Sequence, residues 1–359
     1  MCKASLILLA YRTTLLFFSR ECSGQFLRWR HSPRRIKIWN EIMNFIARFM
    51  LLITAIFSYL PPVGAEDSAV KPFKAAWNVR DHIPLEKFTI QSHRGAGELA
   101  PENTLEAFEL GWKLGTIPEA DVRTTNDGVI VAFHDNDFSR VVRDIGPELK
   151  TKGVADVSFA ELSQLDVGAW RGDEFKGRRV SRMTDVYALM QQHPERRLYL
   201  DYKDAELQQL ADEVSGYGIE SQVILASSKH PLLRRWKKLL PNSGTLLWIP
   251  GTETQKRAAM EAARKTDFDG ITQLQIHVRM PGDATDIQPG EPFSPSRQFL
   301  GEVSIELAER GILFQTLPYG ATDAVTYSQL LDAGLASFAT DYPNVTLKAV
   351  RDYYEVDTK

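Results

Sequence analysis

The chain has 359 residues, 43% of them hydrophobic and 25% charged, so it can bury a sizeable core and is neither a disordered chain nor a small disulfide scaffold. Residues 1–65 carry nine Lys and Arg against two acids, which leaves the remaining body with a net charge of about −10. Such an acidic body excludes nucleic acid as the main partner, and because Cys2 and Cys22 both precede it, it has no disulfide, zinc–thiolate site or cysteine nucleophile.

The first 65 residues have the pattern of a targeting segment. We take Met43 as the start, because Arg48, a short apolar run over 49–60 and a small-residue stretch ending at Ala65 follow it. That order is typical of a secretory signal peptide, so we expect cleavage after Ala65 and an exported mature chain, either periplasmic or secreted. The alternative is an uncleaved signal anchor, which would be the protein's link to a membrane.

The rest of the chain divides into a mature N-terminal segment over 66–87, a body over 88–352 and a C-terminal tail over 353–359. The body alternates short apolar runs with amphipathic stretches, which predicts strands and helices in turn. The expected strands are 88–93, 117–123, 197–202, 222–227, 245–249, 268–273, 312–317 and 336–341. The expected helices are 104–113, 184–192, 205–217, 232–240, 254–264, 302–310 and 324–333.

Eight strands separated by helices predict an α/β fold, a TIM (β/α)8 barrel. One segment departs from the alternation: Asn126-Asp127-Gly128 lies between two apolar runs, and an Asp-Gly turn in that setting favours an antiparallel hairpin. We therefore interpret 129–134 as a small hairpin insertion after the second strand rather than as a ninth barrel strand. The stretch 277–296 is rich in Pro, Gly and Asp and is expected to be a long loop.

Acidic side chains recur on two of the expected strands. Residues two apart on a strand point to the same face, so Glu119 and Asp121 project together, as do Asp201 and Lys203. Inside a barrel, paired carboxylates repel each other unless a proton or a cation compensates their charge. Oxygen ligands suit a hard divalent cation, Mg²⁺ or Ca²⁺, better than Zn²⁺.

Two histidines also follow expected strands. His93 and Arg94 end the first strand, and His134 ends the hairpin arm. Taken singly, these residues have ordinary explanations, such as a core histidine, a turn or a surface ion pair. Their shared position at the carboxyl ends of strands favours a functional interpretation, because barrels carry their chemistry there.

Short motifs follow one another along the body in a fixed order. They are Ser92-His93-Arg94-Gly95, Pro101-Glu102-Asn103-Thr104, Glu119-Ala120-Asp121, Thr125-Asn126-Asp127-Gly128, Val131-Ala132-Phe133-His134-Asp135 and Thr340-Asp341-Tyr342-Pro343. Together with the stretches 165–170 and 175–177, their order and spacing resemble the glycerophosphodiester phosphodiesterase family over about residues 88–350.

The resemblance implies a TIM barrel that hydrolyses a small-molecule glycerophosphodiester to glycerol 3-phosphate and an alcohol. It implies roles for seven residues: His93 and His134 as the acid/base pair, Glu119, Asp121 and Asp201 as ligands of the divalent metal, and Arg94 and Lys203 as contacts of the phosphate.

The sequence departs from the family's pattern at two positions. The third metal ligand is usually Glu and is here Asp201, and Gln315 stands where family members usually carry Trp. The shorter carboxylate changes the reach toward a metal, and the glutamine changes the packing expected near the glycerol.

Several alternatives stay open at this point. The resemblance implies attack by the glycerol 2-hydroxyl to give a cyclic phosphate that water then opens, but the residues are equally compatible with direct attack by water. The substrate could instead be a lipid, as in lysophospholipase D or sphingomyelinase D-like barrels, in which case 277–296 should form an apolar rim. A non-catalytic binding barrel is the third interpretation.

Overall fold

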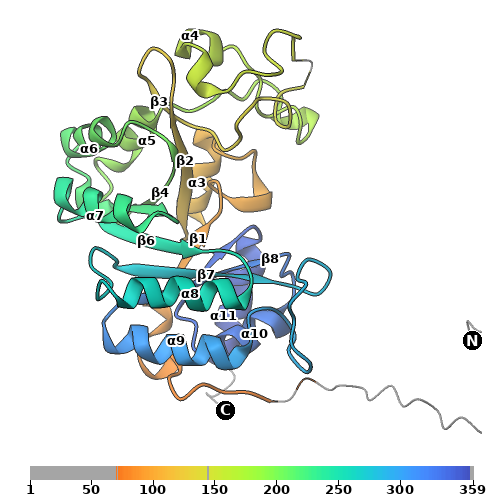
Figure 1. The fold of residues 1–359 in the computed structure, drawn as a ribbon. Coiled ribbons are helices and arrows are strands. Elements are labelled where there is room, and N and C mark those ends of the chain that lie inside the picture. The colour runs from red at the N-terminus through yellow and green to blue at the C-terminus, as the bar shows by residue number, and fades with distance from the viewer. Residues whose placement is uncertain (1–69, 71, 144, 356–359) are drawn as a thin grey trace, which may run out of the picture. The chain divides into compact units, whose positions relative to one another are not determined.

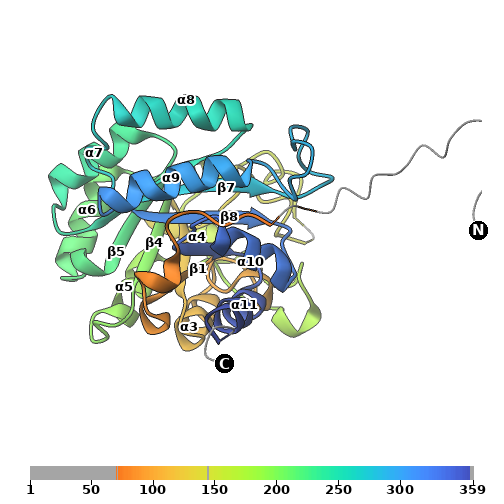
Figure 2. The ribbon, with the colours of Figure 1, turned by 90° about the horizontal axis from the view of Figure 1, so that it is seen from below.

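The computed structural model describes residues 70, 72–143 and 145–355. Eight parallel strands form a closed barrel: β1 pairs with both β2 and β9, and the order around the ring is β1-β9-β8-β7-β6-β5-β4-β2 (Figure 1). Helices surround these strands on the outside (Figure 2). The predicted TIM barrel is therefore confirmed.

The described strands and helices alternate along most of the chain. The strands are β1 (Thr89–Ser92), β2 (Ile117–Thr124), β3 (Ile130–Ala132), β4 (Leu198–Asp204), β5 (Val223–Ser227), β6 (Gly244–Ile249), β7 (Gln273–Arg279), β8 (Leu313–Tyr319) and β9 (Ser337–Thr340). The helices are α3 (Leu105–Lys113), α4 (Phe159–Leu162), α5 (Met183–Met190), α6 (Leu207–Gly216), α7 (His230–Leu239), α8 (Glu253–Arg264), α9 (Arg297–Glu309), α10 (Ala324–Asp332) and α11 (Pro343–Glu355).

The hairpin insertion is confirmed and is larger than a single arm. Strand β3 pairs antiparallel with β2 outside the ring of eight. The chain that follows it, up to α5, packs an apolar cluster separate from the main core, in which Phe133 and Phe138 meet edge to face with ring centroids 5.3 Å apart. This insertion, with α4, lies beyond one end of β2 (Figure 1).

Two expected elements were placed wrongly. The strand expected over 268–273 is β7, which begins only at Gln273, because Asp267 and Phe268 have φ values of 49° and 55° and form the turn that ends α8. The buried Phe268 belongs to that turn, so apolar character alone was misleading. Because β7 is shifted, His277 and Arg279 lie on it and not in the expected loop. The second misplaced element is α9, which begins at Arg297 rather than at 302.

The N-terminal segment and the last helix are joined. Asn78 donates from its side chain to the Tyr353 hydroxyl at 2.8 Å, and the Tyr354 hydroxyl donates to the Ile83 carbonyl at 2.8 Å. Helix α11, which the sequence analysis did not predict, continues past the expected end of the body at 352, to Glu355.

The targeting segment over 1–65, with Met43, Ala65 and both cysteines, lies outside the described residues, as do 356–359 of the expected tail. Export therefore stays a prediction. In the described part of the chain, no helix has the length and apolar character needed to cross a membrane.

The inner face of the barrel follows the two-residue period of its strands. Register pairs Asp121 of β2 with Asp201 of β4, and Arg279 of β7 with Tyr319 of β8. Ile117, Tyr199, Ile224, Ala226 and Leu246 form an apolar cluster of their own, apart from the main core. The next inward positions along β2 and β4 are acidic, so the same alternation that builds the barrel carries charged side chains to its carboxyl end.

Phe338 of β9 packs between the barrel and the residues that surround it, so its substitution should lower the stability of the fold. Its ring is fully buried and contacts those of Phe88 and Tyr327, with centroids 5.9 and 5.1 Å away. Phe338→Ala is expected to lower the free energy of unfolding by about 3–5 kcal/mol, because it removes buried apolar contacts and leaves a cavity. Val325→Ala, at a side chain 66% exposed, is the control and should change it by less than about 0.5 kcal/mol. Urea unfolding measures both; equal effects would contradict the packing described.

Candidate active site

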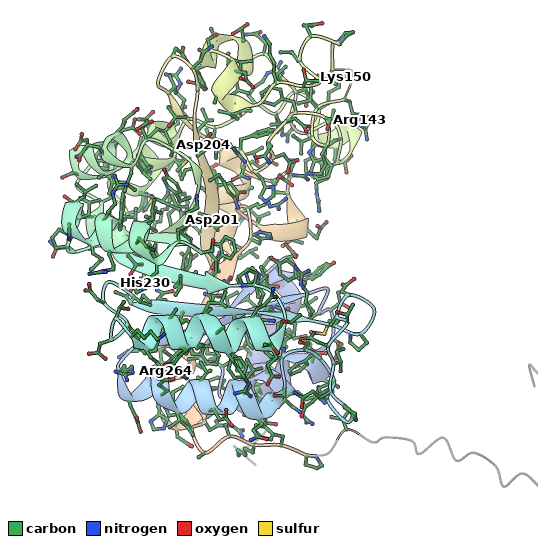
Figure 3. All side chains as sticks on the ribbon, in the orientation of Figure 1. Arg143, Lys150, Asp201, Asp204, His230 and Arg264 are labelled. Atoms are coloured by element: carbon green, nitrogen blue, oxygen red, sulfur yellow. The ribbon has the colours of Figure 1, made fainter. Side chains whose placement is uncertain are left out.

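A pocket of about 310 Å³ opens at the carboxyl end of the barrel strands. Its lining includes both predicted histidines and several of the predicted acids and cations, namely His93, Arg94, Glu119, His134, Asp201 and Lys203. Asp201 lies inside the barrel on β4, whereas Arg143 and Arg264 lie on the outer surface (Figure 3). The structure thus brings together residues that the sequence separates by more than a hundred positions.

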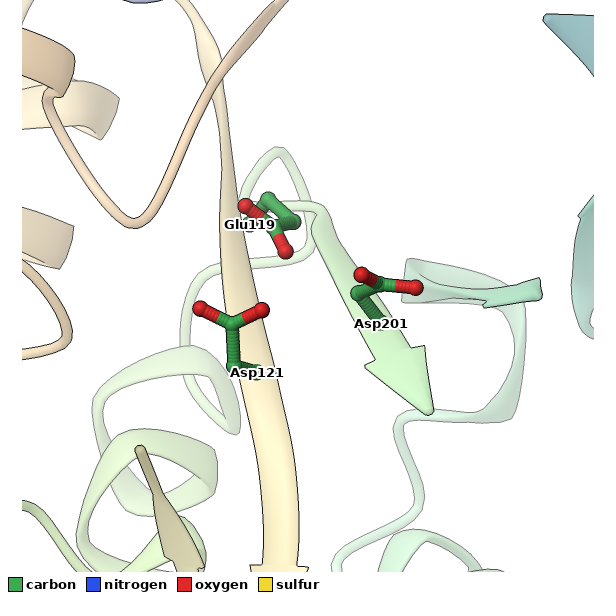
Figure 4. Close-up of side chains that lie close together, drawn as sticks. All are labelled: Glu119, Asp121 and Asp201. Carbon is green, nitrogen blue, oxygen red and sulfur yellow. The ribbon is translucent and has the colours of Figure 1, made fainter. Parts of the chain in front are cut away.

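Glu119, Asp121 and Asp201 form a cluster of carboxylates. The two acids of β2 and the one of β4 turn toward each other, with one oxygen of each within 4.8 Å of the others (Figure 4). Glu119 and Asp121 are almost wholly buried. Burial, reinforced by the charge of Asp121, raises the pKa of Glu119, and burial likewise raises that of Asp201. The cluster therefore needs a compensating positive charge to be fully ionised.

Each carboxylate of the cluster is held by neighbouring groups. The Arg94 amide donates to Glu119 Oε2 at 2.7 Å. Asp201 accepts from Trp248 Nε1 at 3.0 Å and from Lys203 Nζ at 2.5 Å. The contact with Trp248 fixes one oxygen of the shorter side chain that replaces the family's usual Glu.

Asn103 holds Asp121 by two hydrogen bonds. The side chain of Asp121 accepts from Asn103 Nδ2 at 2.7 Å, and its amide donates to Asn103 Oδ1 at 3.0 Å. Although burial opposes ionisation, Lys203 and His134 keep the pKa of Asp121 well below its usual range.

The carboxylates fit a hard divalent cation. Asp121 Oδ1 is buried and has no hydrogen bond of good geometry within the described part of the chain; Lys203 Nζ, at 3.1 Å, is its charged neighbour. Three converging carboxylates without a thiolate match the ligand preference of Mg²⁺ and Ca²⁺. Glu119, Asp121 and Asp201 are thus able to hold such an ion.

Both ring nitrogens of His93 face an acid, and Nδ1 is the one that is hydrogen-bonded. Nδ1 lies 2.6 Å from Asp341 Oδ1, and Nε2 lies 3.9 Å from Glu119 Oε2. Burial opposes the charged ring, but the Asp341 hydrogen bond and the Glu119 charge outweigh it and raise the pKa of His93 to about 9. Asp341 therefore orients the ring and favours its protonated form.

His134 is oriented in a similar way. Its Nδ1 lies 2.6 Å from Asp135 Oδ1, and Asp135 Oδ2 accepts from Arg140 Nε at 2.6 Å. Arg123 of β2 donates to the carbonyl of His134 at 2.8 Å and to Asn136 Oδ1 at 2.8 Å, which ties the insertion to the barrel at this point. Asp135 thus orients the second imidazole.

The two predicted phosphate contacts are paired with acids. Arg94 has the positive φ of 54° and lies 3.1 Å from Glu102, while Lys203 bridges Asp201 and Asp121. Burial opposes the charge of Lys203, but Asp121 and Asp201 outweigh it and raise the lysine's pKa. Both cations line the pocket, so they can reach a bound anion by exchanging partners.

Sequence reasoning missed several residues of the site. Asn103 and Asp341 were given no role, although both belong to motifs that the sequence resemblance rests on. Gln315 does not line the pocket: it lies deeper, donating to the Tyr199 hydroxyl at 3.2 Å and to Ser337 Oγ at 3.1 Å. Three further lining residues, Trp248, His277 and Arg279, had no local signal.

Comparison with known proteins identifies the family of this chain. A model of the glycerophosphoryl diester phosphodiesterase family matches residues 93–345. A glycerophosphodiester phosphodiesterase of Bacillus subtilis is 22% identical over 286 residues, 73% of this chain and 86% of its own length.

Two solved structures share the barrel. A glycerophosphodiester phosphodiesterase from Agrobacterium tumefaciens is 21% identical with a TM-score of 0.55, covering 73% of this chain and 99% of its own. An Oleispira antarctica phosphodiesterase in complex with the product sn-glycerol-3-phosphate is 24% identical with a TM-score of 0.54, covering 73% of this chain and 96% of its own. Because the family model spans most of the body with its motifs in order, this chain belongs to the glycerophosphoryl diester phosphodiesterase family.

Proposed function

We propose that the protein hydrolyses small glycerophosphodiesters to glycerol 3-phosphate and an alcohol in a reaction that depends on a divalent metal, Mg²⁺ or Ca²⁺. Membership of the family supports the phosphodiesterase activity. The observation that carries the finer assignment is that His93, His134, Glu119 and Asp201 all line one pocket. A binding barrel without activity would not need two oriented imidazoles beside a carboxylate cluster.

The carboxylate cluster supports the metal dependence. Glu119, Asp121 and Asp201 would hold the cation, and the chemistry that it supplies is neutralisation of the phosphate charge and polarisation of the P–O bonds. Arg94 and Lys203, released from their acids, would bind the non-bridging oxygens, where negative charge gathers in the transition state.

The two imidazoles would transfer the protons. Asp341 and Asp135 hold Nδ1 of His93 and His134, which leaves Nε2 of each ring to face the substrate. One Nε2 takes the proton of the attacking hydroxyl, from the glycerol 2-position or from water, as the new P–O bond forms. The other gives a proton to the alcohol oxygen as its bond to phosphorus breaks. Attack by water gives glycerol 3-phosphate directly. Attack by the glycerol 2-hydroxyl gives a cyclic phosphate, which water then opens: one imidazole takes the proton of the water and the other protonates O2 as its bond to phosphorus breaks.

The pocket and its rim favour a small soluble substrate over a lipid. Its volume of about 310 Å³ is at the lower end of the range for small-molecule sites, roughly 300–1,000 Å³. In 277–296, the segment expected to form an apolar rim, Phe293 is fully buried and Met280 packs against the core. Among the described residues, the exposed large apolar side chains are Val70, Leu85, Leu99, Ile305 and Val325, none of which lies in that segment.

The test is release of glycerol 3-phosphate from glycerophosphoglycerol by the purified full chain, with and without added Mg²⁺ or Ca²⁺. We expect turnover that needs the metal. Cleavage of a lysolipid, followed by release of its alcohol because its glycerol 3-phosphate stays acylated, should be at least about 10-fold slower under the same conditions. A faster reaction on the lysolipid would replace the proposed substrate class, and failure to cleave either compound would leave the binding barrel as the better interpretation.

A further inference from the structure

The wall of the pocket that faces the acids is built by β6, β7 and β8. In the ring of eight strands, β7 lies four positions from β2 in either direction, so its side chains face Glu119 across the pocket. The wall's lining includes Trp248, His277, Arg279 and Tyr319. Since the phosphate belongs at the carboxylate side, this wall is left for one of the two arms of the diester. The glycerol arm is uncharged, so the charge of this wall bears on the alcohol arm, which we place here.

Arg279 is the cation of this wall, and no described residue is its acidic partner. Within the described part of the chain its guanidinium forms no ion pair, whereas Arg94 and Lys203 each contact carboxylates. Its charged carbon lies 3.8 Å from the centroid of the Tyr319 ring, a contact that holds the side chain against the wall without neutralising it. A half-buried, unneutralised cation in a substrate pocket attracts an anion.

The aromatic rings of this wall are already covered on one face. His277 stacks on Trp248 with centroids 5.4 Å apart and planes at 7°, and Arg279 covers Tyr319. A quaternary ammonium group such as that of choline would need open aromatic faces and no neighbouring cation. The wall is therefore poorly suited to a positively charged alcohol.

His277 adds a neutral polar atom to the same wall. Its side chain is 8% exposed, and Nδ1 has no hydrogen-bond partner within the described residues, while Nε2 lies 3.0 Å from Gln275 Oε1. Burial, together with the nearby cations Arg279 and Lys256, lowers the pKa of His277 to about 3, so the ring is uncharged at neutral pH. Because the ring is neutral, His277 adds no second positive charge to the wall beside Arg279.

We propose that this wall selects glycerophosphodiesters whose alcohol carries a negative charge, a carboxylate or a second phosphate, which Arg279 binds through its guanidinium. The proposal rests on the proposed phosphodiesterase activity and names the class of substrate that the pocket takes. Arg279 is in this sense a specificity-determining residue: it contacts the alcohol moiety and not the bond that breaks.

The test compares three diesters that all release glycerol 3-phosphate. Their alcohols are anionic in bis(glycerophospho)glycerol, neutral in glycerophosphoglycerol and cationic in glycerophosphocholine. We expect kcat/KM to be about 10-fold higher for the anionic than for the neutral compound, and lowest for the cationic one. Arg279→Gln should remove most of the preference for the anionic compound, mainly through KM, and Arg279→Lys should keep part of it.

Arg264→Gln, on the outer helix α8, is the matched control and should leave the ratio between the substrates unchanged. If Arg279 were needed only to support the fold, Arg279→Gln would lower kcat/KM for all three compounds by the same factor, and that result would overturn the proposal. Equal rates on the anionic and neutral compounds by the unaltered protein would also overturn it while leaving the phosphodiesterase activity in place. Cleavage of none of the three would count against the proposed function itself.

Discussion

His93→Ala and His134→Ala are each expected to lower turnover by about 10²–10⁴-fold, the range for loss of a general acid or base. Each imidazole is held by an aspartate at Nδ1, His93 by Asp341 and His134 by Asp135, so alanine at either position removes the oriented Nε2. Neither ring belongs to the main apolar core, so the fold should survive. Release of glycerol 3-phosphate under saturating substrate measures the effect.

The matched control is His193→Ala, because His193 is exposed and pairs with Glu195 outside the pocket. It should keep turnover close to that of the unaltered protein. Thermal unfolding of all three variants separates loss of chemistry from loss of structure. Near-normal rates in His93→Ala or His134→Ala would refute the proton-transfer role of that residue.

Glu119→Gln is expected to lower turnover by about 10²-fold or more, and removal of divalent cations by a chelator should abolish it. The glutamine keeps the shape of the side chain but removes one of three converging charges, so the remaining acids bind a cation more weakly. Titration calorimetry with Mg²⁺ and Ca²⁺ measures that loss independently of activity.

Glu109→Gln, at an exposed position of α3, provides the comparison and should bind the cation normally. Turnover that persists in the chelated protein would remove the metal from the proposed reaction. If Glu119→Gln instead bound the cation as tightly as the unaltered protein, Glu119 would have to be assigned a role other than ligand.

The strands of the barrel were largely predictable because their signal is local. Apolar runs bounded by turns mark β2, β4, β5 and β8 within a few residues, and the two-residue period places Glu119 beside Asp121. The same criterion failed at Phe268, because a buried turn residue and a buried strand residue have the same side-chain chemistry and differ only in φ.

The parts of the site that the sequence did not predict depend on contacts between distant elements. Asn103 reaches Asp121 across 18 positions, and Asp341 reaches His93 across 248. That Arg279 has no ion pair among the described residues can be seen only in the structure, where the acids of the site pair with other cations. No periodicity encodes such partners, so they require the barrel to be closed first.

The insertion that carries His134 lies outside the ring of eight strands and packs by itself. Because it packs around a separate apolar cluster and is tied to the barrel near His134 through Arg123, one of the two imidazoles proposed to transfer protons lies on a segment with its own apolar cluster. Substitutions inside that segment can shift one imidazole relative to the other without altering the eight-stranded ring. The spacing between the two imidazoles can therefore change during evolution while the eight-stranded ring stays constant.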